Sequence, residues 1–316
     1  MASSRRLLTR RSKVFFSFIS ITCSFHGRCG LCEVRVTPDH FGMDIAAENM
    51  PKPEQFFEFA TSIFNAYSRV SSSKGVASML ESLDDQIVQL VNSLAHRSGT
   101  LDLVVVSVLT VKLVLGAVPV TMLCWAWFRE DQDQVHRRIL VLGTLLGTMI
   151  ALALGRALQV CLPFRPRPLY NPELSLQAPD FLPQNVLNDW SSLPSDTAMM
   201  FAALMVGIWA ISRPLGIVAL VHMLLFVVFA KLYTGLHYPS DLLAGAVMGM
   251  GVTWVVLRTT LPQRLYRGLT SWQKRAPGLF YSVFFLVFFE IANLFDDVRE
   301  LIFVADFALV GLQRVL

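Results

Sequence analysis

Charged side chains are scarce in this sequence. Asp, Glu, Lys and Arg make up 16% of its 316 residues, hydrophobic residues make up 54%, and the mean hydropathy is +0.52. A water-soluble domain is ordinarily about one-quarter charged. The shortage of charge therefore argues against a soluble globular domain and indicates that lipid solvates much of the chain.

Strongly basic surfaces are also lacking. The formal net charge is only +4, and the aromatic residues stand among aliphatic ones rather than beside Lys and Arg. Surfaces that bind nucleic acid carry clustered positive charge. We therefore expect membrane lipids, and no nucleic acid, among the partners of this protein.

Cysteine is rare, and only one pair is closely spaced. Of the five cysteines, Cys124 and Cys161 lie in apolar runs, where packing explains them, whereas Cys29 and Cys32 form a C-x-x-C pair. That pair fits either a disulfide in an oxidising compartment or half of a metal site, and no second pair completes a zinc cluster. We predict no bound metal and no cofactor.

The first 32 residues have the pattern of a targeting segment. Basic residues within positions 1–13 precede a short apolar run at residues 14–25. This pattern fits a signal peptide, a short signal anchor or a wrongly assigned start codon. Residues 33–100 are then expected to form a polar linker followed by an amphipathic helix.

The amphipathic helix is predicted from apolar residues that recur at spacings of three and four. They are Val76, Leu80, Leu83, Ile87, Leu90 and Leu94. The opposite face carries Glu81, Asp84, Asp85 and Gln89. Such a helix lies on a membrane surface or against a partner helix and does not cross the bilayer.

Six apolar segments are close to the roughly 20 residues that a membrane-spanning helix needs. They cover residues 102–127, 139–161, 195–212, 214–234, 240–257 and 278–296. The predicted fold class is all-α: a polytopic membrane bundle of about six transmembrane helices, with interfacial helices at both ends. Residues 101–260 form the predicted core, and residues 261–316 add the sixth transmembrane helix and an interfacial C-terminal helix.

Basic residues in the short loops predict the orientation. They concentrate in loop 128–138, at Arg213 and in loop 258–277, which alternate onto one side of the membrane. Short loops rich in Lys and Arg remain in the cytoplasm. Loop 162–194 and the turn at residues 235–240 then face the periplasmic or extracytoplasmic side of the cell (inner) membrane.

Three polar clusters fall at the predicted outer ends of these helices. The clusters are Arg156 with R-P-R-P at residues 165–168, L-P-S-D-T-A at residues 193–198, and Lys231 with His237 and Asp241. Ionisable side chains are costly in lipid and are commonly functional there. Their convergence at one membrane depth predicts a functional site.

The residue types in these clusters suit a bound phosphate. Arginine forks match phosphate oxygens, lysine adds a point charge, and Ser195 begins a helix whose free N–H groups favour an anion. His237 and Asp241 are four residues apart, so on one helical turn the carboxylate can hold an imidazole N–H. A neutral, oriented imidazole beside phosphate is a nucleophile.

Taken together, the clusters resemble the signature of the type 2 phosphatidic acid phosphatase superfamily: K-x6-R-P, P-S-G-H and S-R-x5-H-x3-D. Lys231, His237 and Asp241 match the third motif in spacing, with Lys in the usual place of Arg. In the second motif Asp196 replaces Gly and Thr197 replaces His. In the first motif R-P occurs twice, and the upstream basic residue is Arg instead of Lys. The resemblance covers roughly residues 102–260.

The resemblance implies a metal-independent membrane phosphatase. It implies that His237 is the nucleophile that forms a phosphohistidine, that Asp241 orients it, and that Thr197 stands at the third catalytic position. The substrate-binding positions that it implies are Arg156, Arg165, Arg167, Ser195, Asp196 and Lys231. Of the two R-P arginines, Arg167 is favoured as the phosphate contact and Arg165 is secondary. The expected substrate is a lipid-linked phosphate or diphosphate. A polyprenyl diphosphate is favoured because a threonine hydroxyl cannot protonate an alkoxide leaving group near neutral pH.

A different class of function is also compatible with these departures. The missing motif histidine and the change from Arg to Lys fit a degenerate relative that binds or moves phospholipid headgroups without hydrolysis. The sequence carries no indication of an oligomeric state.

Two ionisable residues lie deep within predicted spans. Lys112 is in the first span and Glu290 is in the last. Charges inside a membrane usually pair or face the bundle interior. We therefore expect these two spans to be neighbours joined by the pair; the alternative is a lysine that snorkels to the interface.

Overall fold

The computed structural model describes residues 15–16, 19–20, 74–183 and 190–295. The chain divides into two compact units, Met1–Asn49 and Met50–Leu316. In the first unit, β1 (Phe15–Phe16) and β2 (Ile19–Ser20) pair antiparallel. Most of the predicted targeting segment, the Cys29 and Cys32 pair, the linker and the predicted C-terminal interfacial helix lie outside the described residues.

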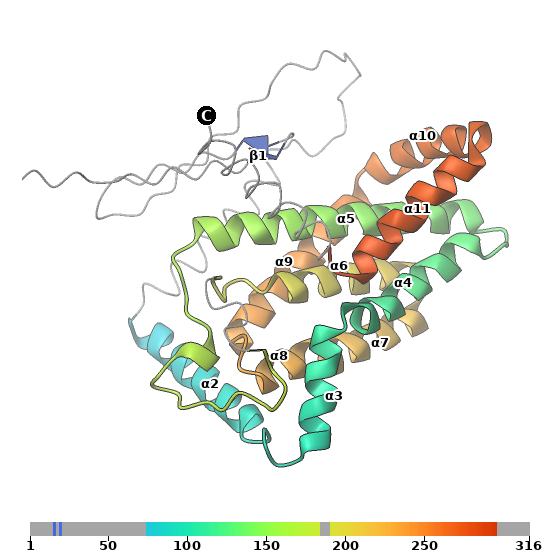
Figure 1. Cartoon of the computed structure of the whole chain (residues 1–316). Coiled ribbons are helices and arrows are strands. Elements are labelled where there is room, and N and C mark those ends of the chain that lie inside the picture. Colours follow the sequence, from blue (N-terminus) through green and yellow to red (C-terminus); the bar gives the residue numbers. More distant parts are fainter. Residues whose placement is uncertain (1–14, 17–18, 21–73, 184–189, 296–316) are drawn as a thin grey trace, which may run out of the picture. The chain divides into compact units, whose positions relative to one another are not determined.

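All regular elements described in the second unit are helices, which confirms the predicted all-α class. In chain order they are α2 (Lys74–Asn92), α3 (Gly99–Thr110), α4 (Lys112–Phe128), α5 (Gln134–Cys161), the 3-10 turn η1 (Pro168–Tyr170), α6 (Asp196–Ile211), α7 (Arg213–His222), the π-helical η2 (Met223–Phe229), α8 (Ala230–Tyr233), α9 (Pro239–Arg258), α10 (Leu261–Arg275) and α11 (Pro277–Ala292). Figure 1 shows these helices in sequence colours.

Three stretches of helix are long and apolar enough to cross a membrane. They are Gln134–Cys161, the continuous run Arg213–Tyr233 and Pro239–Arg258; α3 and α4 add a fourth if their 54° bend belongs to one span. α6 and α11 are apolar but have only 16 residues each. At 1.5 Å per residue they are about 24 Å long, shorter than a hydrocarbon core of about 30 Å. The chain is a multi-pass membrane protein, and the count of six spans stays a prediction.

The centre of the bundle is formed by α5, α6 and α9, which pack against one another (Figure 1). Two glycines of α9 allow its backbone to approach α6 closely. A Cβ atom added at Gly249 would stand 1.9 Å from the carbonyl oxygen of Met199, and one added at Gly245 would stand 2.4 Å from that of Ser195. Small residues at such crossings let transmembrane helices come into direct backbone contact. The contact fixes the start of α6 against the start of α9, where the polar clusters lie.

The first and last predicted spans are neighbours. α4 packs against α11, with the Trp127 ring stacked on Phe280 and tilted against Phe284. Gly116 of α4 lies so close to Ala292 that an added Cβ would meet its carbonyl oxygen at 2.1 Å. The proposed pairing of Lys112 with Glu290 stays a prediction.

Helix α2 presents its polar face to the protein. Asp84, Val88 and Asn92 are buried, whereas the apolar stripe is open, with Leu83 43% and Leu90 71% exposed. Figure 1 shows α2 beside α8, and it contacts both α8 and α9. This arrangement is inverted relative to a soluble protein and leaves the predicted stripe free to contact lipid.

The same end of the bundle is tied together by a buried polar cluster. Asp102 of α3 accepts hydrogen bonds from the Tyr233 hydroxyl and from the backbone N–H of Asp180, at 3.3 Å for the latter. His96 Nδ1 lies 3.2 Å from Asp180 Oδ1. The ligand atoms of His96, Asp102 and Asp180 lie within 4.8 Å of one another, so that they could in principle hold a metal ion. Because each of them is already engaged by protein partners, we interpret the cluster as a tie between α3, α8 and the loop before α6.

Candidate active site

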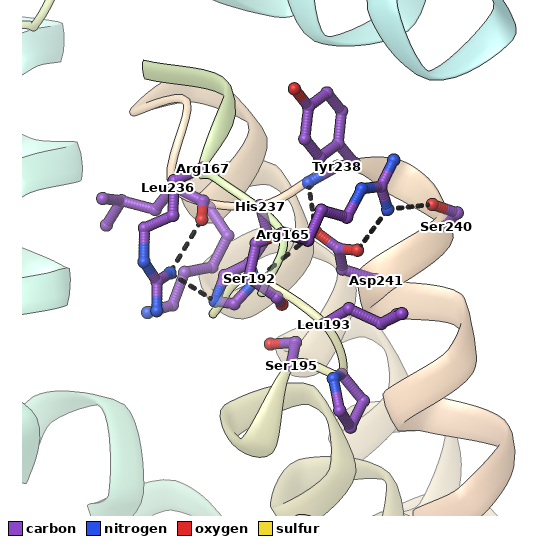
Figure 2. A network of polar contacts seen from close by, with 12 residues as sticks. Arg165, Arg167, Ser192, Leu193, Ser195, Leu236, His237, Tyr238, Ser240 and Asp241 are labelled. Atoms are coloured by element: carbon purple, nitrogen blue, oxygen red, sulfur yellow. Dashed lines mark hydrogen bonds and ion pairs between the residues drawn. The ribbon is translucent and has the colours of Figure 1, made fainter. Parts of the chain in front are cut away.

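The structure brings the three polar clusters to one end of the bundle. Arg156 lies near the end of α5, Arg167 in the loop that follows, and Ser195 at the N-cap of α6. Lys231 lies in α8, His237 in the turn after it, and Asp241 in the first turn of α9. Figure 2 shows the part of this site around His237. The convergence of these residues, predicted from their places at helix ends, is therefore observed.

His237 is buried, with 1% of its surface exposed, and both of its ring nitrogens have partners. Nδ1 lies 2.8 Å from the backbone oxygen of Ser192, and Nε2 lies 3.1 Å from Nη1 of Arg167 (Figure 2). A carbonyl oxygen can only accept, so Nδ1 carries the proton and donates it to Ser192. Nε2 then presents its lone pair toward the Arg167 guanidinium. The ring is fixed in the tautomer that a nucleophile at Nε2 requires.

Burial holds the pKa of His237 well below its ordinary value of 6.5, and the charges of Arg167 and Lys231 lower it further. The hydrogen bond to Ser192 acts in the opposite direction but is outweighed. A histidine with so low a pKa is neutral at pH 7. The site therefore holds a neutral imidazole beside two cations.

Asp241 does not hold the imidazole as the sequence suggested. Its Oδ2 is 3.9 Å from Nδ1 of His237, which is too long for a hydrogen bond. Its carboxylate instead accepts the backbone N–H of Tyr238 at 3.0 Å and Nη1 of Arg165 at 2.5 Å. The expected direct contact is absent because the Asp241 carboxylate caps the start of α9. The Ser192 carbonyl, and not Asp241, accepts the hydrogen bond from Nδ1–H of His237.

Ser192 is a site residue that the sequence reasoning missed. Its side chain is fully buried, its hydroxyl donates to the Pro166 carbonyl oxygen at 3.5 Å, its carbonyl accepts from His237, and its N–H donates to the backbone oxygen of Arg165 at 3.0 Å. The signal that could have found it is its place just before the L-P-S-D segment. Its main role is carried by a backbone atom, which no side-chain motif reveals.

Arg167 and Arg165 occupy different environments. Arg167 is buried and donates from Nη1 to the backbone oxygen of Leu236 at 2.8 Å, besides facing His237. Burial lowers the pKa of Arg167 from its usual value, yet a guanidinium stays charged at any physiological pH. Arg165 lies between two carboxylates: Nη1 donates to Asp241 and Nη2 donates to Asp84 at 2.9 Å. Its guanidinium also covers the Tyr238 ring at 4.1 Å.

Arg156 and Asp196 form an ion pair of 2.6 Å at the edge of the site. Arg156 also donates to Gln159 at 3.2 Å and lies over the Trp190 ring. Asp196 Oδ1 accepts the backbone N–H of Thr197 at 2.8 Å, and the Thr197 hydroxyl lies 3.4 Å from the same oxygen. The carboxylate of Asp196 thus occupies the N-terminus of α6, the place where an anionic ligand was expected.

Ser195 and Lys231 complete the predicted set. Ser195 is fully buried, its hydroxyl accepts the N–H of Ala198 at 3.4 Å, and its N–H donates to the Asp241 backbone oxygen at 3.1 Å. It is therefore the N-cap that joins α6 to α9. Lys231 is 9% exposed, and its charge acts on His237. The site is accordingly rich in fixed positive charge around one neutral imidazole.

Comparison with known proteins supports the resemblance seen in the motifs. Residues 136–264 match the family model described as the PAP2 superfamily, which confirms the type 2 phosphatidic acid phosphatase resemblance over this region. The matched region contains His237 and every other predicted site residue. At the level of the family, this match supports a phosphoester hydrolase that acts on lipid phosphates.

No curated protein matches this chain. One similar solved structure is described as the first transmembrane PAP2 type phosphatidylglycerolphosphate phosphatase from Bacillus subtilis. The match covers 66% of this chain and 94% of that protein's chain. The sequence identity is 19% and the TM-score is 0.37.

Proposed function

We propose that this protein hydrolyses a lipid-linked phosphate or diphosphate through a phosphohistidine formed on His237. The single observation that supports it most is the state of His237: buried, neutral, with Nδ1 held by Ser192 and Nε2 facing Arg167. An imidazole held in this tautomer beside a guanidinium is arranged to attack an anion that the guanidinium binds.

In the proposed reaction, the Nε2 lone pair of His237 attacks phosphorus and the bond from phosphorus to the lipid-side oxygen breaks. The imidazole keeps its Nδ1 proton, which stays hydrogen-bonded to the Ser192 carbonyl. The nearby Asp241 carboxylate stabilises the positive charge that develops on the ring. Water then attacks the same phosphorus, the bond from nitrogen to phosphorus breaks, and inorganic phosphate leaves. One water is consumed, and the leaving oxygen takes its proton from the solvent.

The cations have distinct proposed roles. Arg167 and Lys231 hold the phosphoryl oxygens in this proposal. Arg167 contacts His237, and both cations are close enough to lower its pKa. Arg165 has a supporting role in place of the substrate contact expected from the sequence, since two carboxylates already engage its guanidinium. Arg156 binds the phosphate only when its ion pair with Asp196 breaks.

The substrate that we favour is a diphosphate, such as a polyprenyl diphosphate. Thr197 offers only a hydroxyl where a stronger acid is expected, and the Asp196 carboxylate is paired with Arg156, so neither side chain is placed as a proton donor. Attack on the terminal phosphorus of a diphosphate expels a phosphate ester, which is stable as an anion and needs little protonation.

This preference is tested by comparing kcat/KM for matched lipid mono- and diphosphates in the wild type and in Thr197→His. We expect the wild type to favour the diphosphate and Thr197→His to gain activity chiefly on the monophosphate. A wild type that favours the monophosphate would sink the diphosphate assignment while leaving the phosphatase itself intact.

A second candidate is a relative that binds or moves phospholipid headgroups without hydrolysis. The observation that favours it is the pair of Arg156 with Asp196, which neutralises one of the expected phosphate ligands. Phosphate release from a panel of lipid mono- and diphosphates in detergent separates the two candidates. Release by the wild type that is lost in His237→Ala supports the phosphatase, whereas binding without release supports the second candidate.

A further inference from the structure

Helix α2 lies outside the region that matches the family model, yet one of its residues reaches the candidate active site. Asp84, on the face of α2 opposite the apolar stripe, is buried. Its Oδ2 accepts Nη2 of Arg165 at 2.9 Å and the Ser240 hydroxyl at 2.5 Å, and its Oδ1 accepts the Ser240 backbone N–H at 2.9 Å.

These bonds connect Asp84 to the His237 turn through two routes. Arg165 shares its guanidinium between Asp84 and Asp241, the carboxylate next to His237. Ser240 lies in the first turn of α9, between His237 and Asp241 in the chain, and its hydroxyl also accepts Nη1 of Arg165 at 2.9 Å. One carboxylate on α2 therefore fixes both the side chain and the backbone that hold Asp241 in place.

These polar contacts hold α2 against the bundle together with a little apolar packing, to which Val91 contributes a partly buried side chain. Its apolar stripe points away from the protein, and Val88 is its one fully buried apolar side chain among the residues described, packed with Leu174 and Tyr238. Asn92 adds two hydrogen bonds at the far end of the helix, to the backbone oxygens of Gln177 and Tyr233. Buried charge-assisted bonds are costly to leave half-made, so removal of Asp84 would release Arg165 and Ser240 together.

We propose that α2 is a working part of the active site and that Asp84 is a positioning residue, which acts through Arg165 and Ser240 to keep Asp241 and the His237 turn in reactive geometry. This proposal rests on the phosphatase function proposed above. It makes turnover depend on a helix whose other face is apolar and exposed.

The experiment uses the full chain in detergent and compares Asp84→Asn with Glu81→Gln, which removes the same charge from an exposed position of the same helix. We expect Asp84→Asn to lower kcat at least about tenfold with KM within roughly twofold, because a charge-assisted contact is lost but no substrate contact is. Glu81→Gln should match the wild type. In an Arg165→Gln background, Asp84→Asn should lower kcat further by less than about threefold, since the two residues act as one unit.

A second measurement does not depend on activity. The Ser240 N–H is bonded to Asp84, so amide hydrogen exchange over residues 238–242 should be faster in Asp84→Asn than in the wild type or Glu81→Gln. Unchanged exchange, or an equal loss of kcat from Asp84→Asn in both Arg165 backgrounds, overturns the proposal. If the wild type releases no phosphate, the proposed function fails, and the exchange result alone decides whether Asp84 holds the His237 turn.

Discussion

At the scale of single residues, the chemistry depends on the charge state of His237. The imidazole is buried, its Nδ1 proton is committed to the Ser192 carbonyl, and two cations lower its pKa. A protonated ring would have no lone pair and would repel Arg167 and Lys231. The neutral form is therefore the form that the fold accommodates, and protonation must work against folding.

The buried imidazole makes stability depend on pH. The pKa of His237 is well below 6.5 in the folded protein, while an unfolded chain takes up a proton near 6.5. Below that pH the unfolded state binds more protons, so stability falls as pH falls, by up to about 1.4 kcal/mol per pH unit. We expect the melting temperature of the wild type to fall more between pH 7 and 5 than that of His237→Gln. Parallel falls would contradict a neutral, buried His237.

Arg167 should matter more for catalysis than an exposed arginine of α10. Arg167→Met removes a charge-assisted contact worth about 1.5–3 kcal/mol, so kcat/KM should fall roughly tenfold to a hundredfold. Arg264→Met, at an exposed position of α10, is the matched control and should change kcat/KM by less than about twofold. Equal effects of the two substitutions would remove Arg167 from the phosphate site.

The sequence predicts side chains of the site better than it predicts their contacts. His237, Arg167 and Lys231 could be singled out because ionisable residues at span ends are unusual. The Ser192 carbonyl could not, because a backbone acceptor has no residue signature. Asp84 could be placed on the polar face of its helix, but its burial could not be predicted, because an amphipathic pattern separates polar from apolar faces without saying which face meets the protein when lipid is the solvent.

At the scale of elements, the apolar segments located the helices well. The predicted segment 139–161 falls within α5, and segment 240–257 falls within α9. The sequence did not foresee that the segment at 102–127 would break at Val111, where α3 ends and α4 begins. The pattern of apolar residues continues through the break and therefore carries no sign of the bend.

The close crossing of α6 and α9 is sensitive to a single methyl group. Gly249→Ala would place Cβ 1.9 Å from the Met199 carbonyl oxygen, so the helices must separate, at a cost of about 1–3 kcal/mol or more. We expect a lower melting temperature and weaker activity. Gly268→Ala in α10, where no atom lies within 4 Å of the added Cβ, should leave both unchanged or slightly raise stability. Similar melting temperatures for the two variants would refute the tight crossing.

At the scale of the whole molecule, the distribution of basic residues predicts that the proposed site faces the outer side of the membrane. Single cysteines can test this in a variant freed of its native cysteines. Glu173→Cys, in the loop before α6, should react with a membrane-impermeant maleimide in intact cells. Arg267→Cys, in α10, should react only after the membrane is opened; both positions are exposed. The reverse pattern of labelling would place the proposed site in the cytoplasm.

The proposed reaction depends above all on the transfer of a phosphoryl group to His237. The most direct test is to quench the full-length protein during turnover of a lipid diphosphate labelled in its terminal phosphate, and to locate the label by mass spectrometry under conditions that preserve phosphohistidine. We predict that the label is on His237 and that His237→Ala neither carries it nor releases phosphate. Phosphate release at the wild-type rate by His237→Ala would contradict the account.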